Sequence, residues 1–202
     1  MSGSSIFVFP LIVMGLFAWH PPSERTDGTD SAKNRELTAG LRLLALNRKP
    51  GEARISVPKT GGGVWGTVAD ISFANGTTVT VAAFMDGSAS IYTSAGGAVI
   101  GGAAIESVRA AAKAAVATME DCSASMKARG IQGLPRPGHA TLYALSRSGL
   151  LSSEELVSDE LLAGGHAFSR CYLAVKEVIT KLGAVSSSPP ETLNKVLKVG
   201  SG

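Results

Sequence analysis

Two short turn signals divide one stretch of this sequence into three strand-like runs, and they constrain the fold more than any other feature. Asn75-Gly76 separates the runs 64–74 and 77–85, and Asp86-Gly87 separates the second run from a third at 88–93. Asn-Gly and Asp-Gly are the strongest two-residue signals for a type I′ hairpin turn, in which both central residues need a positive φ. The pattern therefore predicts a three-stranded antiparallel meander.

Amphipathic helical patterns lie on both sides of the meander. Apolar residues recur every three or four positions along 103–129 and again from Phe168 to Leu182, which is the spacing of one helix face. An earlier leucine-rich pattern at 35–47 predicts a further helix, and it ends before Pro50 because proline cannot continue a helix.

Two more strand-like runs, 138–147 and 150–157, follow the long helix. An apolar sheet face has to be covered, and the two long amphipathic patterns suit that role. We therefore expect an α+β fold with a five-stranded antiparallel sheet (a three-strand meander, a long helix, then two strands), covered by two long amphipathic helices in two or three layers. One domain at 34–184 fits a chain of 202 residues.

The terminal segments are predicted to lie outside this domain. In the segment 1–20, residues 6–19 form an apolar run that no Lys or Arg precedes and that is shorter than the roughly 20 residues of a membrane span. Three interpretations stay open: a membrane tether, a secretion signal, or an upstream extension of a chain that starts at Met14. Residues 21–33 are predicted to be a flexible linker and 185–202 a C-terminal tail.

Composition narrows the classes of partner and site. The formal net charge is only +3 and basic residues are not clustered, so we expect no nucleic acid partner. Cys122 and Cys171 lie in no CxxC pair and have no His at metal-ligand spacing, so we expect no metal and no cofactor. We interpret both as buried free thiols rather than a disulfide, which favours a reducing compartment and a cytoplasmic or membrane-associated protein.

The segment from Ser94 to Gly102 is unusually rich in glycine. Gly96 and Gly101 have the spacing of a P-loop, but that motif needs Lys and then Ser or Thr where this chain has Gly-Ala. A helix N-terminus after such a loop can still hold an anion. One hypothesis is therefore small-anion or nucleotide binding through Ser94, Gly96, Gly97, Gly101 and Gly102. The other is tight packing of the strand-to-helix connection.

No catalytic residue is predicted. The sequence has no GxSxG elbow, and no nucleophile stands at a known spacing from His139 or His166. Asp70 lies in an otherwise apolar strand-like run, where side-chain alternation favours a solvent-facing position. An enzyme that uses Asp70 or His139 remains a third hypothesis.

The segment 86–102, DGSASIYTSAGGAVIGG, carries Tyr-x-Ser-x-Gly-Gly and then Ile-Gly before an Ala-rich helix. It resembles a family of uncharacterised bacterial proteins, and the similarity extends through Val64-Trp65-Gly66 and Gly164-Gly165-His166 to cover residues 35–183. The resemblance implies no site residue. A looser similarity is to roadblock-like and profilin-like modules, which bind proteins or membranes and have two strands before the long helix where this chain has three.

These observations predict a non-enzymatic interaction or regulatory module, tethered to a membrane if residues 6–19 serve as an anchor. Trp65 and Tyr92 are the predicted interface anchors because Trp and Tyr are favoured at interfaces, with core packing as the alternative. The expected partner is another protein or a second copy of the chain. Anion binding by the glycine-rich loop 94–102 is the alternative function.

Overall fold

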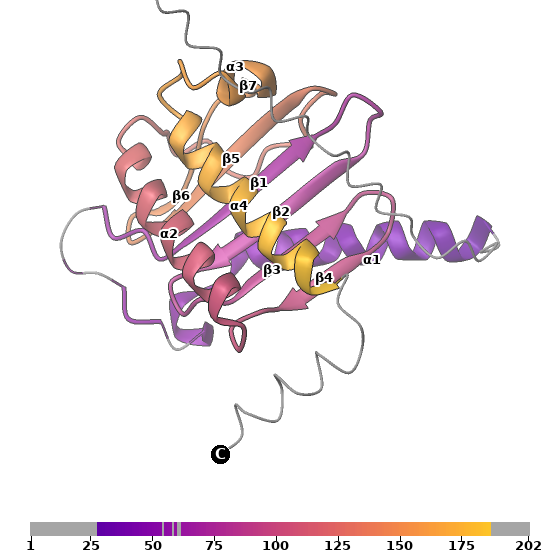
Figure 1. The fold of residues 1–202 in the computed structure, drawn as a ribbon, viewed down its shortest axis with the longest axis horizontal. Coiled ribbons are helices and arrows are strands. Elements are labelled where there is room, and N and C mark those ends of the chain that lie inside the picture. The colour runs from indigo at the N-terminus through magenta and orange to yellow at the C-terminus, as the bar shows by residue number, and fades with distance from the viewer. Residues whose placement is uncertain (1–27, 54, 58, 60–61, 187–202) are drawn as a thin grey trace, which may run out of the picture.

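The computed structural model describes residues 28–53, 55–57, 59 and 62–186, which form an α+β fold in three layers (Figure 1). A seven-stranded antiparallel sheet is the middle layer. Helices α2 (Glu106–Ser123) and α4 (Ser169–Ser186) lie side by side on one face of the sheet, and α1 (Gly28–Asn47) crosses the other face. None of the helices in these ranges combines the length and apolar character that a bilayer span requires.

The predicted meander is confirmed. Strands β1 (Gly66–Ser72), β2 (Thr78–Phe84) and β3 (Ala89–Thr93) pair antiparallel in sequence order. The turns differ in type from the prediction. The N–H groups of Gly76 and Gly87 close four-residue turns, each at 2.9 Å, and both glycines have a positive φ. These are therefore the longer hairpin connections, in which a turn is followed by a left-handed glycine.

The sheet has two strands more than the five predicted. Its order is β4-β3-β2-β1-β5-β6, with β7 also paired to β5 (His139–Ser146). Strand β4 (Ala98–Gly101) comes from the glycine-rich segment, which the sequence pattern predicts as a loop. The predicted strand at 150–157 divides into β6 (Gly149–Ser152) and β7 (Leu156–Val157). The short helix α3 (Ser158–Leu162) follows.

The helical layers also correct the prediction that two long helices cover the sheet. Helices α2 and α4 cover one face, while α1 packs on the opposite face and is followed by the short 3₁₀ helix η1 (Pro50–Ala53). Helix α1 begins at Gly28, inside the predicted linker 21–33, so the last part of that linker is helical. The predicted apolar segment 6–19 and residues 187–202 of the predicted tail lie outside the described residues.

Cys122 of α2 and Cys171 of α4 form a disulfide, so the interpretation of both as free thiols is wrong. The sequence pattern places each cysteine on an amphipathic helix but does not show that the helices lie against each other. In the structure α2 and α4 lie against each other, and the Cα atoms of the two cysteines are 6.8 Å apart, within the usual range for a disulfide. A disulfide between these cysteines removes the reason to expect a reducing compartment.

Candidate functional site

The sheet face beneath α1 has a buried charge at its centre. Asp70 lies in the middle of β1, is completely buried, and stands opposite Thr80 of β2 and Thr141 of β5. The prediction that Asp70 faces solvent is wrong, because α1 covers this face of the sheet. A buried carboxylate needs an opposite charge and hydrogen bonds to offset the loss of water.

Arg42 of α1 supplies both. Its Nε donates to both carboxylate oxygens of Asp70, at 3.1 and 2.9 Å, and its Nη2 donates to Oδ2 at 2.6 Å. The same Nη2 donates to the carbonyl oxygen of Gln132 at 2.9 Å and to the hydroxyl of Tyr143 at 3.2 Å. Thr80 Oγ1 donates to Asp70 Oδ1 at 2.5 Å. The network therefore ties α1 to three strands and to the segment after α2.

The face around this ion pair has an apolar half and a polar half. The apolar half packs beneath the C-terminal part of α1 and comprises Ala45, Leu46, Trp65, Val68, Ala82, Phe84, Tyr92, Tyr143 and Leu145. In the polar half, four buried hydroxyl side chains share the face of Asp70: Ser72, Thr78, Thr80 and Thr141. Hydroxyls contribute little apolar burial, so this half of the face is suited to hydrogen bonding rather than to packing.

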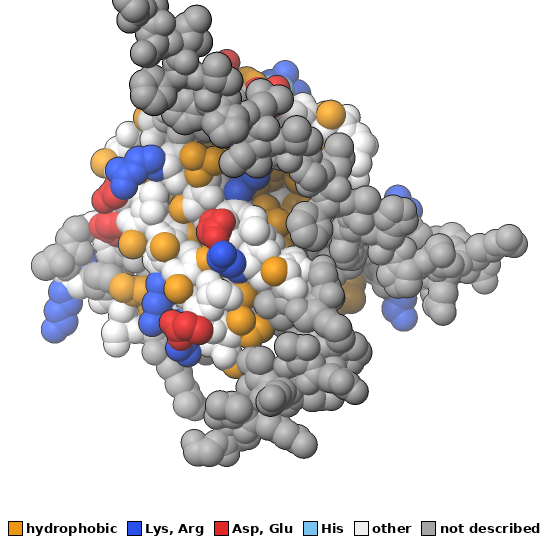
Figure 2. Space-filling view, viewed as in Figure 1, with side chains coloured by type: hydrophobic (Ala, Val, Ile, Leu, Met, Phe, Trp, Pro, Cys, Tyr) orange, Lys and Arg blue, Asp and Glu red, His pale blue; other side chains and the backbone are white. Residues whose placement is uncertain are grey.

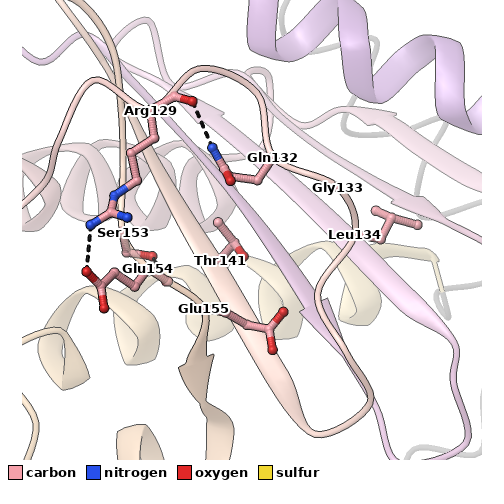
Figure 3. Close-up of a pocket in the computed structure, with 8 residues that line it drawn as sticks. All are labelled: Arg129, Gln132, Gly133, Leu134, Thr141, Ser153, Glu154 and Glu155. Atoms are coloured by element: carbon pink, nitrogen blue, oxygen red, sulfur yellow. Dashed lines mark hydrogen bonds and ion pairs between the residues drawn. The ribbon is translucent and has the colours of Figure 1, made fainter.

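One hollow of about 420 Å³ lies on the β5 side of the ion pair. Figure 3 shows its walls, which come from the segment 129–134, from Thr141 of β5 and from 153–155. Arg129 pairs with Glu154 at 2.6 Å at one rim. Glu155 is bound by Arg136 at 2.5 Å, and this hydrogen bond is the main reason that the pKa of Glu155 is lowered. The acidic groups of this hollow are therefore already paired within the protein.

A second hollow, of about 320 Å³, lies between α1 and the β2–β3 side of the sheet. It borders the same Arg42, and Leu134 lines both hollows. Helix α1 contributes one wall and the strands contribute the other, and the lining residues are Arg35, Thr38, Ala39, Arg42, Leu43, Thr78, Thr80, Tyr92, Thr93, Ser94 and Leu134. Among the residues that the structure describes, the lining of this hollow has two arginines and several hydroxyls and no carboxylate.

The protonation of the network favours a structural role for the ion pair. Burial, followed by the nearby charge of Asp70, raises the pKa of Tyr143 to about 12, so its hydroxyl is neutral at physiological pH. Asp70 already accepts hydrogen bonds from Arg42 and Thr80 and is sealed from solvent. Neither group is presented as a nucleophile or a general base.

The two predicted interface anchors are inside the protein. Trp65 is 3% exposed and Tyr92 is 8% exposed, and both belong to the apolar cluster beneath α1. The ring of Trp65 stacks on that of Phe84, and the hydroxyl oxygen of Tyr92 lies 2.6 Å from Ser90 Oγ. Core packing, the alternative interpretation, accounts for both aromatic side chains.

The predicted anion-binding residues do not converge on one site. Gly96, with a φ of 89°, and Gly97 lie in the turn between β3 and β4, whereas Gly101 ends β4. Ser94 lines the hollow beneath α1, and the glycines are not among its lining residues. The anion hypothesis therefore has no support from the glycines as a group.

Gly102 has a packing role that explains the end of the glycine-rich segment. Its φ is 95°, and a Cβ built on it would come within 2.5 Å of Val108 Cγ1 and 3.2 Å of Leu182 Cδ2. The connection from β4 can thus pass close to α2 and α4 only without a side chain. Helix α2 itself begins at Glu106, an acidic residue that is unfavourable for an anion at that terminus.

The histidines have local partners. The Nδ1 of His139 lies 2.9 Å from the carbonyl oxygen of Pro137, and its Nε2 lies 3.9 Å from Glu155. The N–H of Phe168 donates to the ring of His166 at 3.2 Å. Within the described ranges, no three or more His, Cys, Asp or Glu side chains are grouped so as to hold a metal ion.

Comparison of the chain with protein-family models, with curated proteins and with solved structures found no match. The resemblance to an uncharacterised bacterial family and to roadblock-like or profilin-like modules therefore stays a prediction.

Proposed function

We propose that this chain is a non-enzymatic interaction module and that its primary interface is the open edge of the sheet at β4. The observation that carries this proposal is the difference between the two edges of the sheet. At the opposite edge, Lys127 pairs with Ser152 of β6 through two main-chain hydrogen bonds of 3.1 and 2.8 Å. In the part of the chain that the structure describes, no segment pairs with the outer side of β4.

The main chain of β4 has hydrogen-bonding groups directed toward this open side. The N–H of Thr93 donates to the carbonyl oxygen of Gly97 at 2.9 Å, and Val99 stands opposite Ile91 in the register. Because the direction of main-chain groups alternates along an antiparallel strand, those of Ala98 and Ile100 point away from β3. An added strand would satisfy them.

The side chains of β4 do not protect the edge. Natural proteins block edge strands with charged residues, with proline or with bulges. The sequence of β4 is Ala-Val-Ile-Gly, and its Ile100 is 67% exposed. An uncharged edge strand with an exposed branched side chain favours pairing with an added strand over staying exposed to solvent.

A second copy of the chain is the occupant that we propose. Antiparallel pairing of β4 with itself places the same neutral strand on both sides, which is the self-complementary arrangement of a two-fold dimer. Helix α1 contacts β3, the strand next to β4, so the partner would also lie near the α1 layer. There Leu37 and Leu44 are 61% and 70% exposed and add apolar surface.

The opposite face offers a contrast and a control. Figure 2 shows the α2 and α4 side, where basic and acidic side chains are interspersed and apolar side chains are scattered. Leu173 is also an exposed branched apolar residue, with 44% of its surface exposed, but it lies on helix α4 rather than on the edge strand β4. It therefore serves as the control position for Ile100.

Sedimentation equilibrium of the full chain tests the proposal. We expect the unmodified protein and Leu173→Asp to form dimers at micromolar concentration. Ile100→Asp should be monomeric, because pairing of the edge strands would dehydrate the introduced carboxylate. A wild-type protein that stays monomeric throughout this range would contradict self-association. Tethering to a membrane by residues 6–19 is a separate hypothesis, which removal of that segment would test by vesicle flotation.

A further inference from the structure

We propose that Asn75, in the turn between β1 and β2, is an acceptor for an N-linked oligosaccharide. The triplet Asn75-Gly76-Thr77 fits the acceptor pattern Asn-x-Ser/Thr, in which x is not proline. The other asparagines of the chain, at 34, 47 and 194, are followed two positions later by Glu, Lys and Val. This inference goes beyond the interaction at β4, because Asn75 lies at the end of two inner strands and not along that edge.

The turn presents Asn75 to solvent. Asn75 is exposed, and the chain folds tightly around it. The N–H of Gly76 donates to the carbonyl oxygen of Phe73 at 2.9 Å, and the N–H of Phe73 donates to the carbonyl oxygen of Thr77 at 2.9 Å. A Cβ built on Gly76 would meet no atom within 4 Å. The folded protein therefore has open space beside Asn75 for a bulky, solvated sugar chain.

The hydrogen bonds of the Asn75 side chain leave its nitrogen accessible. The Oδ1 atom accepts a hydrogen bond from the N–H of Thr77 at 3.0 Å. In the part of the chain that the structure describes, Nδ2 has no hydrogen-bond partner. The same contact keeps Thr77, whose hydroxyl completes the triplet, next to the Asn75 amide. The atom that would carry the sugar is thus exposed, and attaching a sugar to it breaks no hydrogen bond within the protein.

The co-substrate is a lipid-linked oligosaccharide, and an oligosaccharyltransferase is the catalyst. A bond forms between Asn75 Nδ2 and the anomeric carbon of the first sugar. The bond from that carbon to the phosphate oxygen of the lipid carrier breaks, so the lipid pyrophosphate is the leaving group. Nδ2 gives up one proton, and no atom is oxidised or reduced.

The disulfide is a second, independent observation that favours this modification. Cys122 and Cys171 are joined, and the chain has no other cysteine. Disulfides form and persist in oxidising compartments such as the endoplasmic reticulum and are rare in the cytosol. Proteins that pass through such a compartment are the ones in which an exposed Asn-x-Thr triplet serves as an acceptor.

Cell-free translation of the full chain with endoplasmic reticulum microsomes tests the proposal. We expect part of the wild-type protein to gain the mass of one oligosaccharide, and peptide-N-glycosidase should remove this mass. Asn75→Gln and Thr77→Ala should abolish the gain, whereas Thr77→Ser should keep it because serine also supplies a hydroxyl. Asn47→Gln is the matched control at an exposed asparagine outside any such triplet and should be modified as the wild type is.

The readout is a covalent change of mass, so it stays informative for a variant that does not fold. A wild-type chain that gains no oligosaccharide would overturn the proposal. An oligosaccharide that is still attached in Asn75→Gln would overturn it as well, because the acceptor would then be another residue.

Discussion

Arg42 and Asp70, 28 residues apart in the sequence, join the C-terminal half of α1 to the centre of the sheet through three hydrogen bonds. The Arg42 side chain is 11% exposed and that of Asp70 is fully buried. This pair holds α1 on the sheet, and Arg42 also lines the hollow between α1 and the sheet.

Removing one member of this pair should be costly. We predict that Asp70→Asn lowers the free energy of unfolding by about 3 kcal/mol, because it leaves the Arg42 charge partly buried without its counterion. Urea denaturation measures the loss. The double replacement Arg42→Met with Asp70→Leu should recover part of it, since an apolar pair has no charge to desolvate. A stability for Asp70→Asn within 0.5 kcal/mol of the wild type would show that the pair does not anchor α1.

Tyr143 should make the protein sensitive to alkaline pH. Its folded-state pKa is raised to about 12, against roughly 10 in the unfolded chain, so the folded state holds the proton more tightly. The stabilisation is complete below pH 10 and is lost as the pH rises to 12, by up to about 2 kcal/mol.

Chemical denaturation at pH 9 and at pH 11.5 tests this dependence. Burial also raises the pKa of Tyr172, which contributes in the same direction, so the informative comparison is with Tyr143→Phe. That variant should lose less stability between the two pH values than the wild type. Equal losses of stability in both proteins would show that Tyr143 is not the source of the pH dependence.

The Cys122–Cys171 disulfide should stabilise the α2–α4 layer. It joins residues 49 positions apart, and the chain-entropy model gives about 4 kcal/mol for a loop of that length. We expect dithiothreitol, or the change of both cysteines to Ala, to lower the melting temperature by several degrees. Titration of the non-reduced protein with a thiol reagent should find no free thiol, and two reactive thiols after unfolding would refute the crosslink.

Neighbouring glycines offer a matched test of the β4-to-α2 connection. Gly102→Ala should destabilise the protein by about 3 kcal/mol, because its Cβ would meet Val108 and the backbone would also be strained. Gly101→Ala, with a φ of 119° and open space around it, adds only the backbone strain of about 1–2 kcal/mol. If thermal unfolding shows equal losses of stability for the two variants, close packing is not the reason that position 102 needs glycine.

The sequence predicts the local elements of this fold well and its tertiary pairings poorly. Asn75-Gly76 and Asp86-Gly87 are local signals, and they correctly predict β1 to β3. The apolar periodicities likewise locate α2 and α4. Strand β4 is not predicted because its four residues lie between glycines and are stabilised by the register with β3 rather than by their own propensity.

Helix α1 shows why the site itself is hard to predict. Its leucine pattern suggests that leucines face the sheet, yet Leu37 and Leu44 are exposed while Thr38 is buried and Arg42 binds Asp70. The available signal was the i,i+4 pair of Thr38 and Arg42 on one helix face, together with a lone carboxylate in an apolar strand. Neither is informative until the strand and the helix are placed against each other.

Amide hydrogen exchange at Ile100 tests the proposed interface most directly. Its N–H points away from β3, so in a free chain it should exchange as an exposed amide, whereas that of Val99 should be protected by β3. If β4 pairs with a second copy, protection of the amide at position 100 should rise with protein concentration in the wild type and should not rise in the Ile100→Asp variant. An Ile100 amide that exchanges rapidly at every concentration would contradict the account.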